Sequence, residues 1–126
     1  MISFVVPIRP QGKGRPRFAR AGDGVRTYTD AKTRAYEEMV RLHAIRAMAG
    51  RKPFDAAVEV EILAGFKSST TPGWFVAGAD ADNIGKAALD AMNGVVYRDD
   101  GLVVSLLVVK IRTWSDQLEI TVSELP

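Results

Sequence analysis

The run LVVSLLVVKI at residues 102–111 is the feature that most limits the folds open to this chain. Only Ser105 and Lys110 interrupt it, so apolar and polar residues do not alternate as they do in a strand with one wet face. Apolar runs of this kind are typical of strands that are covered on both faces. We therefore predict a strand that lies in the middle of a sheet or packs against a second subunit.

Other segments supply further strands. Residues 2–7 (ISFVVP) are rich in β-branched side chains, and QLEITV at residues 117–122 predicts a closing strand. Residues 58–62 alternate valine and isoleucine with glutamate, which predicts a strand with one wet face. The twenty or so residues after the first strand are rich in Gly, Arg and Pro and predict a loop.

A first helix is predicted from Thr29 or Asp30, either of which can cap it, to about Ala49. Glu37 and Arg41 are expected to form an ion pair on its outer face. Helical spacing of three and four residues predicts an inward apolar stripe at Ala35, Met39, Leu42, Ile45 and Ala49.

A second helix is predicted from Asp82 to Asn93-Gly94, a pair that commonly ends helices. Its inward positions are expected to be Ile84, Ala87, Ala88, Leu89 and Ala91. The resulting order is strand, helix, strand, helix, strand, strand. It predicts an α+β fold in which two main helices pack on a mixed β-sheet, in a single domain over residues 1–126.

The composition excludes several kinds of site. The chain has no cysteine and one histidine, His43, which we interpret as structural, so thiolate and multi-histidine metal sites are excluded. A bound metal would have oxygen ligands. The sequence shows neither a signal peptide nor a run of roughly eighteen apolar residues, so a cytoplasmic protein is expected.

Charge is unevenly distributed along the chain. Residues 1–50 carry ten Lys and Arg against four Asp and Glu, whereas residues 51–126 carry seven against eleven. A basic segment followed by an acidic centre suits a protein that attracts a polyanion and acts on it through a metal ion. An unevenly solvated surface is the alternative interpretation.

The acidic centre contains Asp80, Asp82 and the pair Asp99-Asp100. Asp82 is expected to cap the second helix, with Asp80 just outside it, and helix capping alone would explain both residues. A tight Asp-Gly turn would explain one of the later pair. The second helix returns the chain through only a few residues, so the start of the last hairpin is expected to bring Asp100 beside Asp80 and Asp82. Together the three would offer Mg²⁺ the carboxylate oxygens that it prefers.

Lys86 lies one helical turn after Asp82, and Asp90 lies one turn further. The spacing fits a surface ladder of ion pairs. Beside a metal site, the lysine could instead orient an attacking water or neutralise charge that develops on a phosphate. The spacing leaves both interpretations open.

A basic segment, QGKGRPRFARAG at residues 11–22, has cations spaced by Gly and Pro around Phe18. Such a segment adds salt-sensitive affinity for nucleic acid, or it is a solvated loop. The predicted DNA-binding residues are Lys13, Arg15, Arg17 and Arg20.

Taken together, these motifs resemble the RusA-type Holliday junction resolvases, endodeoxyribonucleases often carried by phages and prophages. The matching features are KGRPRF at residues 13–18, RTYT at 26–29, RAYEE at 34–38 and D-x-D-N-x-x-K-x-x-x-D-x-x-N-G from Asp80, followed by Asp-Asp. The resemblance covers most of the chain. It implies a magnesium-dependent homodimer, with Mn²⁺ as a possible substitute, that binds four-way or other branched DNA and nicks two strands symmetrically in recombination and repair.

The resemblance also implies roles for single residues. Asp80, Asp82 and Asp100 would be metal-binding catalytic acids, and Lys86 would be the essential catalytic lysine. Asn83, Asp90 and Asp99 would support them. The chain departs from the family pattern at Gly101-Leu102 and at Gly85, which predicts a changed contact near the site and a less rigid second helix.

Two other functions fit the same residues. A non-catalytic DNA-binding module would use its aspartates only for a helix cap and a turn, and its affinity for DNA would not depend on Mg²⁺. A metal-dependent phosphohydrolase of small nucleotides would release phosphate or pyrophosphate without cleaving DNA. The basic segment and the lack of an aromatic cluster for a nucleobase favour the nuclease over the phosphohydrolase.

Overall fold

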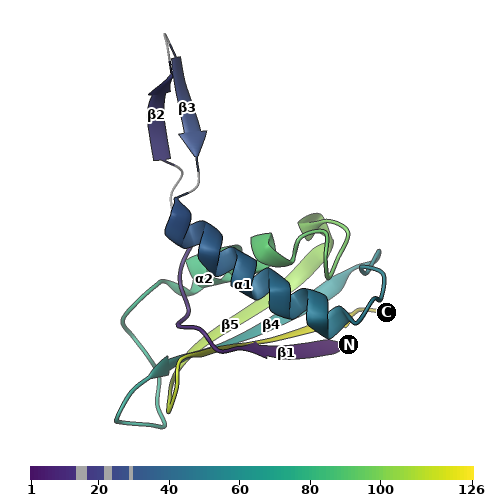
Figure 1. Ribbon diagram of the computed structural model, residues 1–126. Helices are drawn as coiled ribbons and strands as arrows, with labels where there is room; N and C mark the ends of the chain where they lie inside the picture. The colour runs from purple at the N-terminus through teal and green to yellow at the C-terminus, as the bar shows by residue number, and fades with distance from the viewer. Residues whose placement is uncertain (14–16, 22–23, 29) are drawn as a thin grey trace.

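The chain forms a four-stranded sheet with two helices packed on one of its faces, as the computed structural model in Figure 1 shows. The structure describes residues 1–13, 17–21, 24–28 and 30–126, and it describes 17–21 and 24–28 by their backbone pairing. The predicted α+β fold with a mixed sheet is confirmed. Neither helix of the described chain is long and apolar enough to cross a membrane.

The sheet contains β1 (Ile2–Val6), β4 (Val58–Lys67), β5 (Val103–Thr113) and β6 (Gln117–Glu124) in the order β1-β6-β4-β5. The central strand β4 runs parallel to β5 and antiparallel to β6. Helix α2 (Ala81–Met92) makes the crossover between the two parallel strands. It therefore runs back against their direction, and it begins at the end of the molecule where β4 and β5 finish.

Strand β5 lies at the edge of the sheet, so the prediction of a mid-sheet position is wrong. Its first half is open to solvent, with Val104 64% exposed and Leu107 53% exposed. The expected hairpin between the last two strands is also wrong, because β4 lies between β5 and β6. A second subunit remains the candidate cover for β5.

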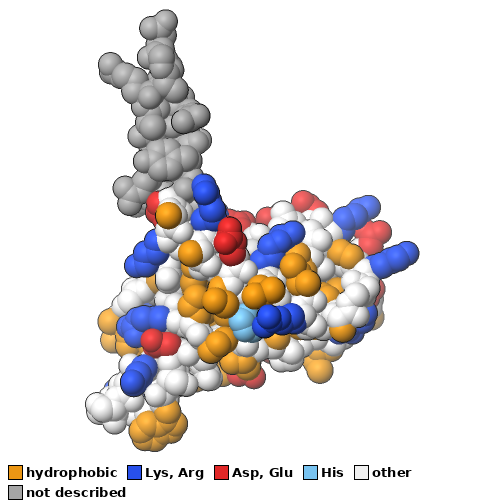
Figure 2. Space-filling view, viewed as in Figure 1, with side chains coloured by type: hydrophobic (Ala, Val, Ile, Leu, Met, Phe, Trp, Pro, Cys, Tyr) orange, Lys and Arg blue, Asp and Glu red, His pale blue; other side chains and the backbone are white. Residues whose placement is uncertain are grey.

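Helix α1 (Ala31–Met48) begins at Asp30, whose carboxylate accepts a hydrogen bond from Thr33 N at 2.7 Å. The helix buries Thr33, Tyr36, Val40, Ala44 and Met48. The predicted inward stripe is wrong, since Met39, Leu42 and Ile45 are 40–50% exposed. Two apolar stripes share the four-residue spacing, and the one that contains Tyr36 and Val40 faces the sheet. Figure 2 shows the other as apolar side chains on the outer face of α1.

Helix α2 buries most of its predicted inward face. Ile84, Ala87, Ala88 and Ala91 are buried, and Leu89 is partly buried. The prediction that Asp82 caps the helix is wrong, because the N-cap is Asp80, two residues earlier, and Asp82 lies in the first turn.

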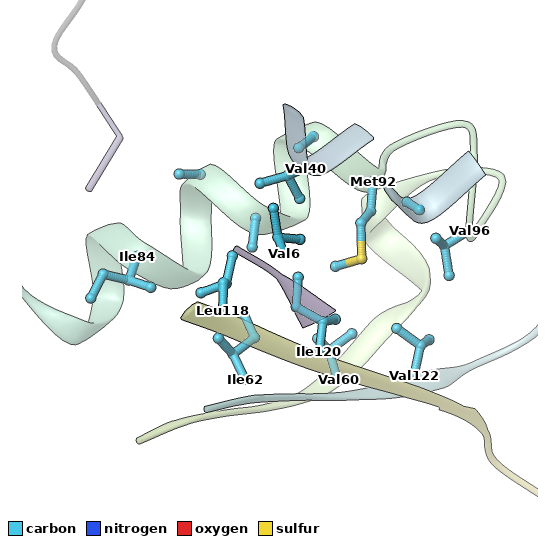
Figure 3. Close-up of a cluster of buried hydrophobic side chains, with 14 of the residues drawn as sticks. Val6, Val40, Val60, Ile62, Ile84, Met92, Val96, Leu118, Ile120 and Val122 are labelled. Atoms are coloured by element: carbon cyan, nitrogen blue, oxygen red, sulfur yellow. The ribbon is translucent and has the colours of Figure 1, made fainter. Parts of the chain in front are cut away.

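The core lies between the two helices and the sheet (Figure 3). Val60 and Ile62 of β4 meet Leu118, Ile120 and Val122 of β6 there, while the glutamates between them lie on the other face. The alternation predicted for residues 58–62 is therefore confirmed. The sheet supports α2, and α2 carries the acidic motif.

A short hairpin, β2 (Arg17–Ala21) and β3 (Gly24–Tyr28), lies between β1 and α1. The two strands pair antiparallel, with Arg17 opposite Tyr28. The prediction of a loop is therefore wrong for these residues. Phe18, Val25, Thr27 and Tyr28 are residue types that favour strands, and they outweigh the Gly and Pro around them.

Candidate active site

Asp80 and Asp82 both lie at the start of α2. Asp80 caps the helix through its backbone, since its carbonyl accepts from Ile84 N at 3.0 Å. Its carboxylate makes no capping hydrogen bond, in contrast to Asp30 at the start of α1. Both side chains are available to solvent, with Asp80 and Asp82 outside the buried core. The two carboxylates are therefore available to a ligand, and no capping hydrogen bond accounts for the Asp80 side chain.

Asp99 and Asp100 have different roles: one forms the turn, and the other has a free side chain among the described residues. The Asp99 carboxylate accepts from Gly101 N at 2.9 Å and so caps the short 3-10 helix η1 (Asp100–Leu102). Asp100 is exposed, and its side chain makes no hydrogen bond to another described residue. A Cβ on Gly101 would stand 2.8 Å from the Asp99 carboxylate, so this departure from the family pattern makes room for the cap.

The structure does not bring Asp100 to Asp80 and Asp82 within one chain. Among the described residues, no group of three acidic or histidine side chains could hold a metal ion. The reason is the direction of α2, which places Asp80 where β5 ends and Asp100 just before β5 begins. The expectation that all three converge in a single chain assumed that the short return after α2 reaches the start of that helix, whereas β5 begins at its other end.

Asp100 instead lies near the C-terminal half of α2. Tyr97 is buried there, and its hydroxyl donates to the Leu89 carbonyl at 2.6 Å. Burial raises the pKa of Tyr97 well above its usual 10.0, and the negative charges of Asp100 and Asp90 raise it further. The hydroxyl therefore stays protonated and acts as a structural donor.

Lys86 is exposed on α2 and forms no ion pair with Asp82 or Asp90 in the described part of the chain. The surface ladder that the spacing allowed is therefore not formed. Asn83 is also exposed, and its backbone carbonyl accepts from Lys13 N at 3.0 Å. The outer face of α2 thus presents a lysine without a bound carboxylate one turn after Asp82.

Lys13 ties the segment after β1 to both helices. Its ammonium lies 3.1 Å from the Asp90 carboxylate and also binds Glu37 of α1. Burial alone would lower the pKa of Lys13, but hydrogen bonds to Glu37 and Asp90, and their charges, outweigh it and raise the pKa. No pattern in the sequence indicated this contact, which joins residues far apart in the chain.

The expected pair of Glu37 and Arg41 does not form. Glu37 binds Lys13, and the Arg41 guanidinium donates to the Asn93 carbonyl at 3.0 Å. Arg41 thus supports the end of α2, while Lys13 holds Asp90 one turn before that end.

The remaining predicted DNA-binding residues stay predictions. Arg15 lies outside the described residues, and Arg17 and Arg20 lie in β2, which is described by its backbone pairing. Lys13 is one-fifth exposed and its charge is already paired, so a phosphate would have to compete with two carboxylates.

A hollow of about 540 Å³ opens beside the start of α2. Arg9, which is paired with Asp116 at 3.2 Å, and Lys32 supply positive charge to it, Asp30 supplies negative charge, and Gly78 and Ala79 line its wall just before Asp80. Beneath it, Phe66 and Phe75 stack with their ring centres 4.1 Å apart, and the Arg9 guanidinium lies 5.2 Å from the centre of the Phe66 ring. The cations suit a phosphate, whereas the carboxylates of Asp80 and Asp82 would need a metal ion between them and a phosphate.

A sequence model described as endodeoxyribonuclease RusA matches residues 7–123 of the 126. The chain belongs to the RusA family. RusA proteins are endodeoxyribonucleases that resolve Holliday junctions, so this chain is an enzyme of that class. No curated protein sequence matches it. The matched range contains the acidic motif, the pair Asp99-Asp100 and the basic segment.

Proposed function

We propose that this RusA protein is a Mg²⁺-dependent nuclease that resolves four-way DNA junctions by two symmetric nicks. The observation that carries the proposal is the unused carboxylate of Asp80, which stands with Asp82 at the start of α2. A residue kept only for capping would use its side chain, as Asp30 does.

The donor set suits Mg²⁺ but is incomplete in one chain. Asp80, Asp82 and Asp100 offer the carboxylate oxygens that Mg²⁺ binds, with Mn²⁺ as a substitute. The described residues of a single chain contain no group of three such side chains. We therefore propose that Asp100 joins the other two from a second copy.

The free edge of β5 supports this arrangement. Along its second half, Arg112 N donates to Gly73 O at 2.7 Å and Phe75 N donates to Lys110 O at 3.1 Å. Along its first half, no described strand pairs with the edge opposite β4, and Val104, Leu106 and Leu107 are exposed. An open, apolar edge of this kind favours pairing with another strand.

Antiparallel pairing of two β5 edges would complete both sites. Because residues 73–75 cover the second half of each edge, the two first halves would pair, and the start of one β5 would point toward the end of the other, where α2 begins. Asp100 of the partner subunit would then approach Asp80 and Asp82. Such a dimer has two-fold symmetry and two equal sites, which matches the approximate symmetry of a four-way junction.

Within each site the side chains have separate tasks. Asp80, Asp82 and the partner's Asp100 would hold the ion, which supplies charge stabilisation and helps a water molecule to lose a proton. Lys86, which forms no ion pair with another described residue, would approach the scissile phosphate and offset its growing negative charge. Arg9 and Lys32 would bind a neighbouring phosphate at the hollow.

The test compares labelled four-way junction with linear duplex of the same sequence, with Mg²⁺, with Mn²⁺ and with EDTA. We expect paired nicks in the junction only, with either metal. Asp82→Asn and Lys86→Met should lower the rate by at least about a hundredfold while junction binding is retained. Asp55→Asn, which removes an exposed acid paired with Arg98, is the control.

The same assay separates the two alternatives. A DNA-binding module would bind the junction equally in EDTA and release no product, and a nucleotide phosphohydrolase would release phosphate from nucleotides but leave DNA intact. Either outcome would refute the nuclease. The unused Asp80 carboxylate already disfavours the first, because that alternative needs the aspartate as a cap.

A further inference from the structure

Both tryptophans of the chain are exposed, and both lie at the end of the sheet where α2 begins. Trp74 is 72% exposed and Trp114 is 75% exposed. Trp74 forms a bridge with Ile111 near the end of β5, and Trp114 directly follows that strand. An indole left open to water is uncommon on a surface that binds nothing, because it forfeits a large area of apolar burial.

Hydrogen bonds hold the two segments that carry these rings together. Ser68 N donates to Thr113 O at 2.9 Å, and Arg112 Nη1 donates to Thr70 Oγ1 at 2.9 Å. The loop before Trp74 is thus fixed to the residues before Trp114. In Figure 2 apolar side chains gather at the lower end of the molecule, with Lys and Arg side chains close by.

Positive charge accompanies the indoles. Arg112 and Trp74 line one hollow of about 350 Å³, together with Pro72, Gly73 and Ile111. The Arg112 guanidinium lies so close to Gly73 that a Cβ there would stand 2.2 Å from Nη2. Lys67, which is exposed, lies opposite Thr113 in the register of β4 and β5. A fixed guanidinium beside the Trp74 ring, with Trp114 and Lys67 at the same end of the sheet, matches a nucleic-acid strand, whose bases stack and whose phosphates need cations.

We propose that Trp74 and Trp114 form a stacking platform for unpaired bases of the DNA substrate, with Arg112 and Lys67 binding the adjoining phosphates. The inference rests on the proposed function, because it takes branched DNA as the substrate. In a linear duplex every base is stacked on its neighbours and offers no free face. Where strands exchange at a branch, bases can unstack. The platform would therefore favour branched or single-stranded DNA and hold it beside Asp80 and Asp82.

The chain provides its own reporter, since it has two tryptophans and both belong to the platform. In EDTA, which prevents cleavage, tryptophan fluorescence is recorded while a twenty-nucleotide oligo-dT, a four-way junction or a linear duplex is added. Anisotropy of a dye on the DNA measures binding separately. We expect strong quenching by oligo-dT and by the junction, and weak quenching by the duplex at equal occupancy.

Variants test the affinity. Trp74→Leu and Trp114→Leu should each weaken oligo-dT binding by about five- to a hundredfold, the range that corresponds to the loss of one stacked base. Val76→Ser changes a 94% exposed apolar side chain in the same loop and should bind like the wild type. Thermal unfolding confirms that each variant folds.

Three results would overturn the platform. The first is unchanged fluorescence at saturating DNA, and the second is equal quenching by duplex and single strand. The third is a loss of self-association in the leucine variants, by light scattering, with DNA affinity unchanged, because the rings would then cover a second copy. Nicking is measured separately. If the wild type nicks junctions but its tryptophan fluorescence does not change on DNA binding, only the platform is refuted. If DNA quenches the fluorescence but no nicking occurs, only the nuclease is refuted.

Discussion

The Lys13 ammonium lies 3.1 Å from the Asp90 carboxylate and binds Glu37 on its other side, so that one cation joins the segment after β1 to both helices. All three side chains are no more than 31% exposed. Removal of the cation would leave two carboxylates close together without a counter-charge. This arrangement makes Lys13 part of the scaffold that positions α2.

We therefore predict that Lys13→Met lowers the free energy of unfolding by roughly 1–3 kcal/mol, the usual cost of a partly buried charged group that loses its partner. Urea denaturation of the two proteins measures it. Lys52→Met, which removes an exposed lysine, should change the free energy by less than about 0.5 kcal/mol. Equal effects of the two substitutions would show that the Lys13 contacts contribute nothing.

The difference in unfolding free energy between the wild type and Lys13→Met should depend on pH. The pKa of Lys13 is raised in the folded protein, from a usual value of 10.5, by its two carboxylate partners against the opposing effect of burial. Folded Lys13 thus holds its proton more tightly than unfolded Lys13, so its stabilisation is complete below the unfolded pKa and is lost as pH rises through the folded one. The gap between wild type and Lys13→Met should be constant to about pH 10 and shrink above it.

A second prediction contrasts the two helix caps. Asp30→Ala removes a hydrogen bond to Thr33 N, whereas Asp80→Ala removes a carboxylate that makes no such bond. Both lose the interaction with the helix dipole, so their difference reflects the contacts that only the Asp30 side chain makes, the bond to Thr33 N among them. Asp30→Ala should destabilise the protein by about 0.5–1.5 kcal/mol more than Asp80→Ala does. Nicking should nevertheless be abolished by Asp80→Ala, and a stability cost equal to that of Asp30→Ala would restore the capping explanation.

These contrasts show what the sequence could and could not predict. The strand at residues 58–62 and its buried face were predictable, because the glutamates mark the solvent-facing side of β4. The two stripes of α1 share one spacing, so periodicity alone could not choose between Tyr36 and Met39. The apolar run of β5 indicated that a cover is needed but not whether the same chain supplies it, and in this structure the strand lies at an edge.

The positions of Asp80, Asp82 and Lys86 relative to one another were predictable, but the distance that separates them from Asp100 was not. The spacing of Asp80, Asp82 and Lys86 places them at one end of one helix, a local relationship that can be derived from helical geometry. The position of Asp100 depends instead on the direction in which β5 runs. In this structure α2 connects two parallel strands, so β5 begins at the opposite end of the helix from Asp80. The order strand, helix, strand does not by itself specify parallel pairing, so the separation of Asp100 from Asp80 could not be derived from the sequence.

A third prediction concerns the free edge of β5. Leu107, 53% exposed, lies on the face of β5 away from α2 and is one of the side chains that a second copy would cover. Leu107→Asp should convert a dimer to a monomer without loss of folding, because a charge on an open edge opposes strand pairing. Light scattering measures the mass and circular dichroism the fold. Ile45→Asp, at a similarly exposed position on α1, is the control that should leave the dimer intact.

The last prediction tests whether Asp100 acts on its own chain or across the dimer. Asp82→Asn and Asp100→Asn should each be inactive alone. In a mixed dimer, one site contains both substitutions. The other site contains the unchanged Asp82 of one chain and the partner's Asp100, which is also unchanged. Such a mixture should therefore regain nicking, limited to one strand of each junction, after the proteins are unfolded and refolded together. If Asp100 instead served its own chain, each site would lack one acid and the mixture would stay inactive. Joint refolding of Asp80→Asn with Asp82→Asn is the matched control, because both defects lie at the same helix start and no pairing of chains rebuilds an intact site.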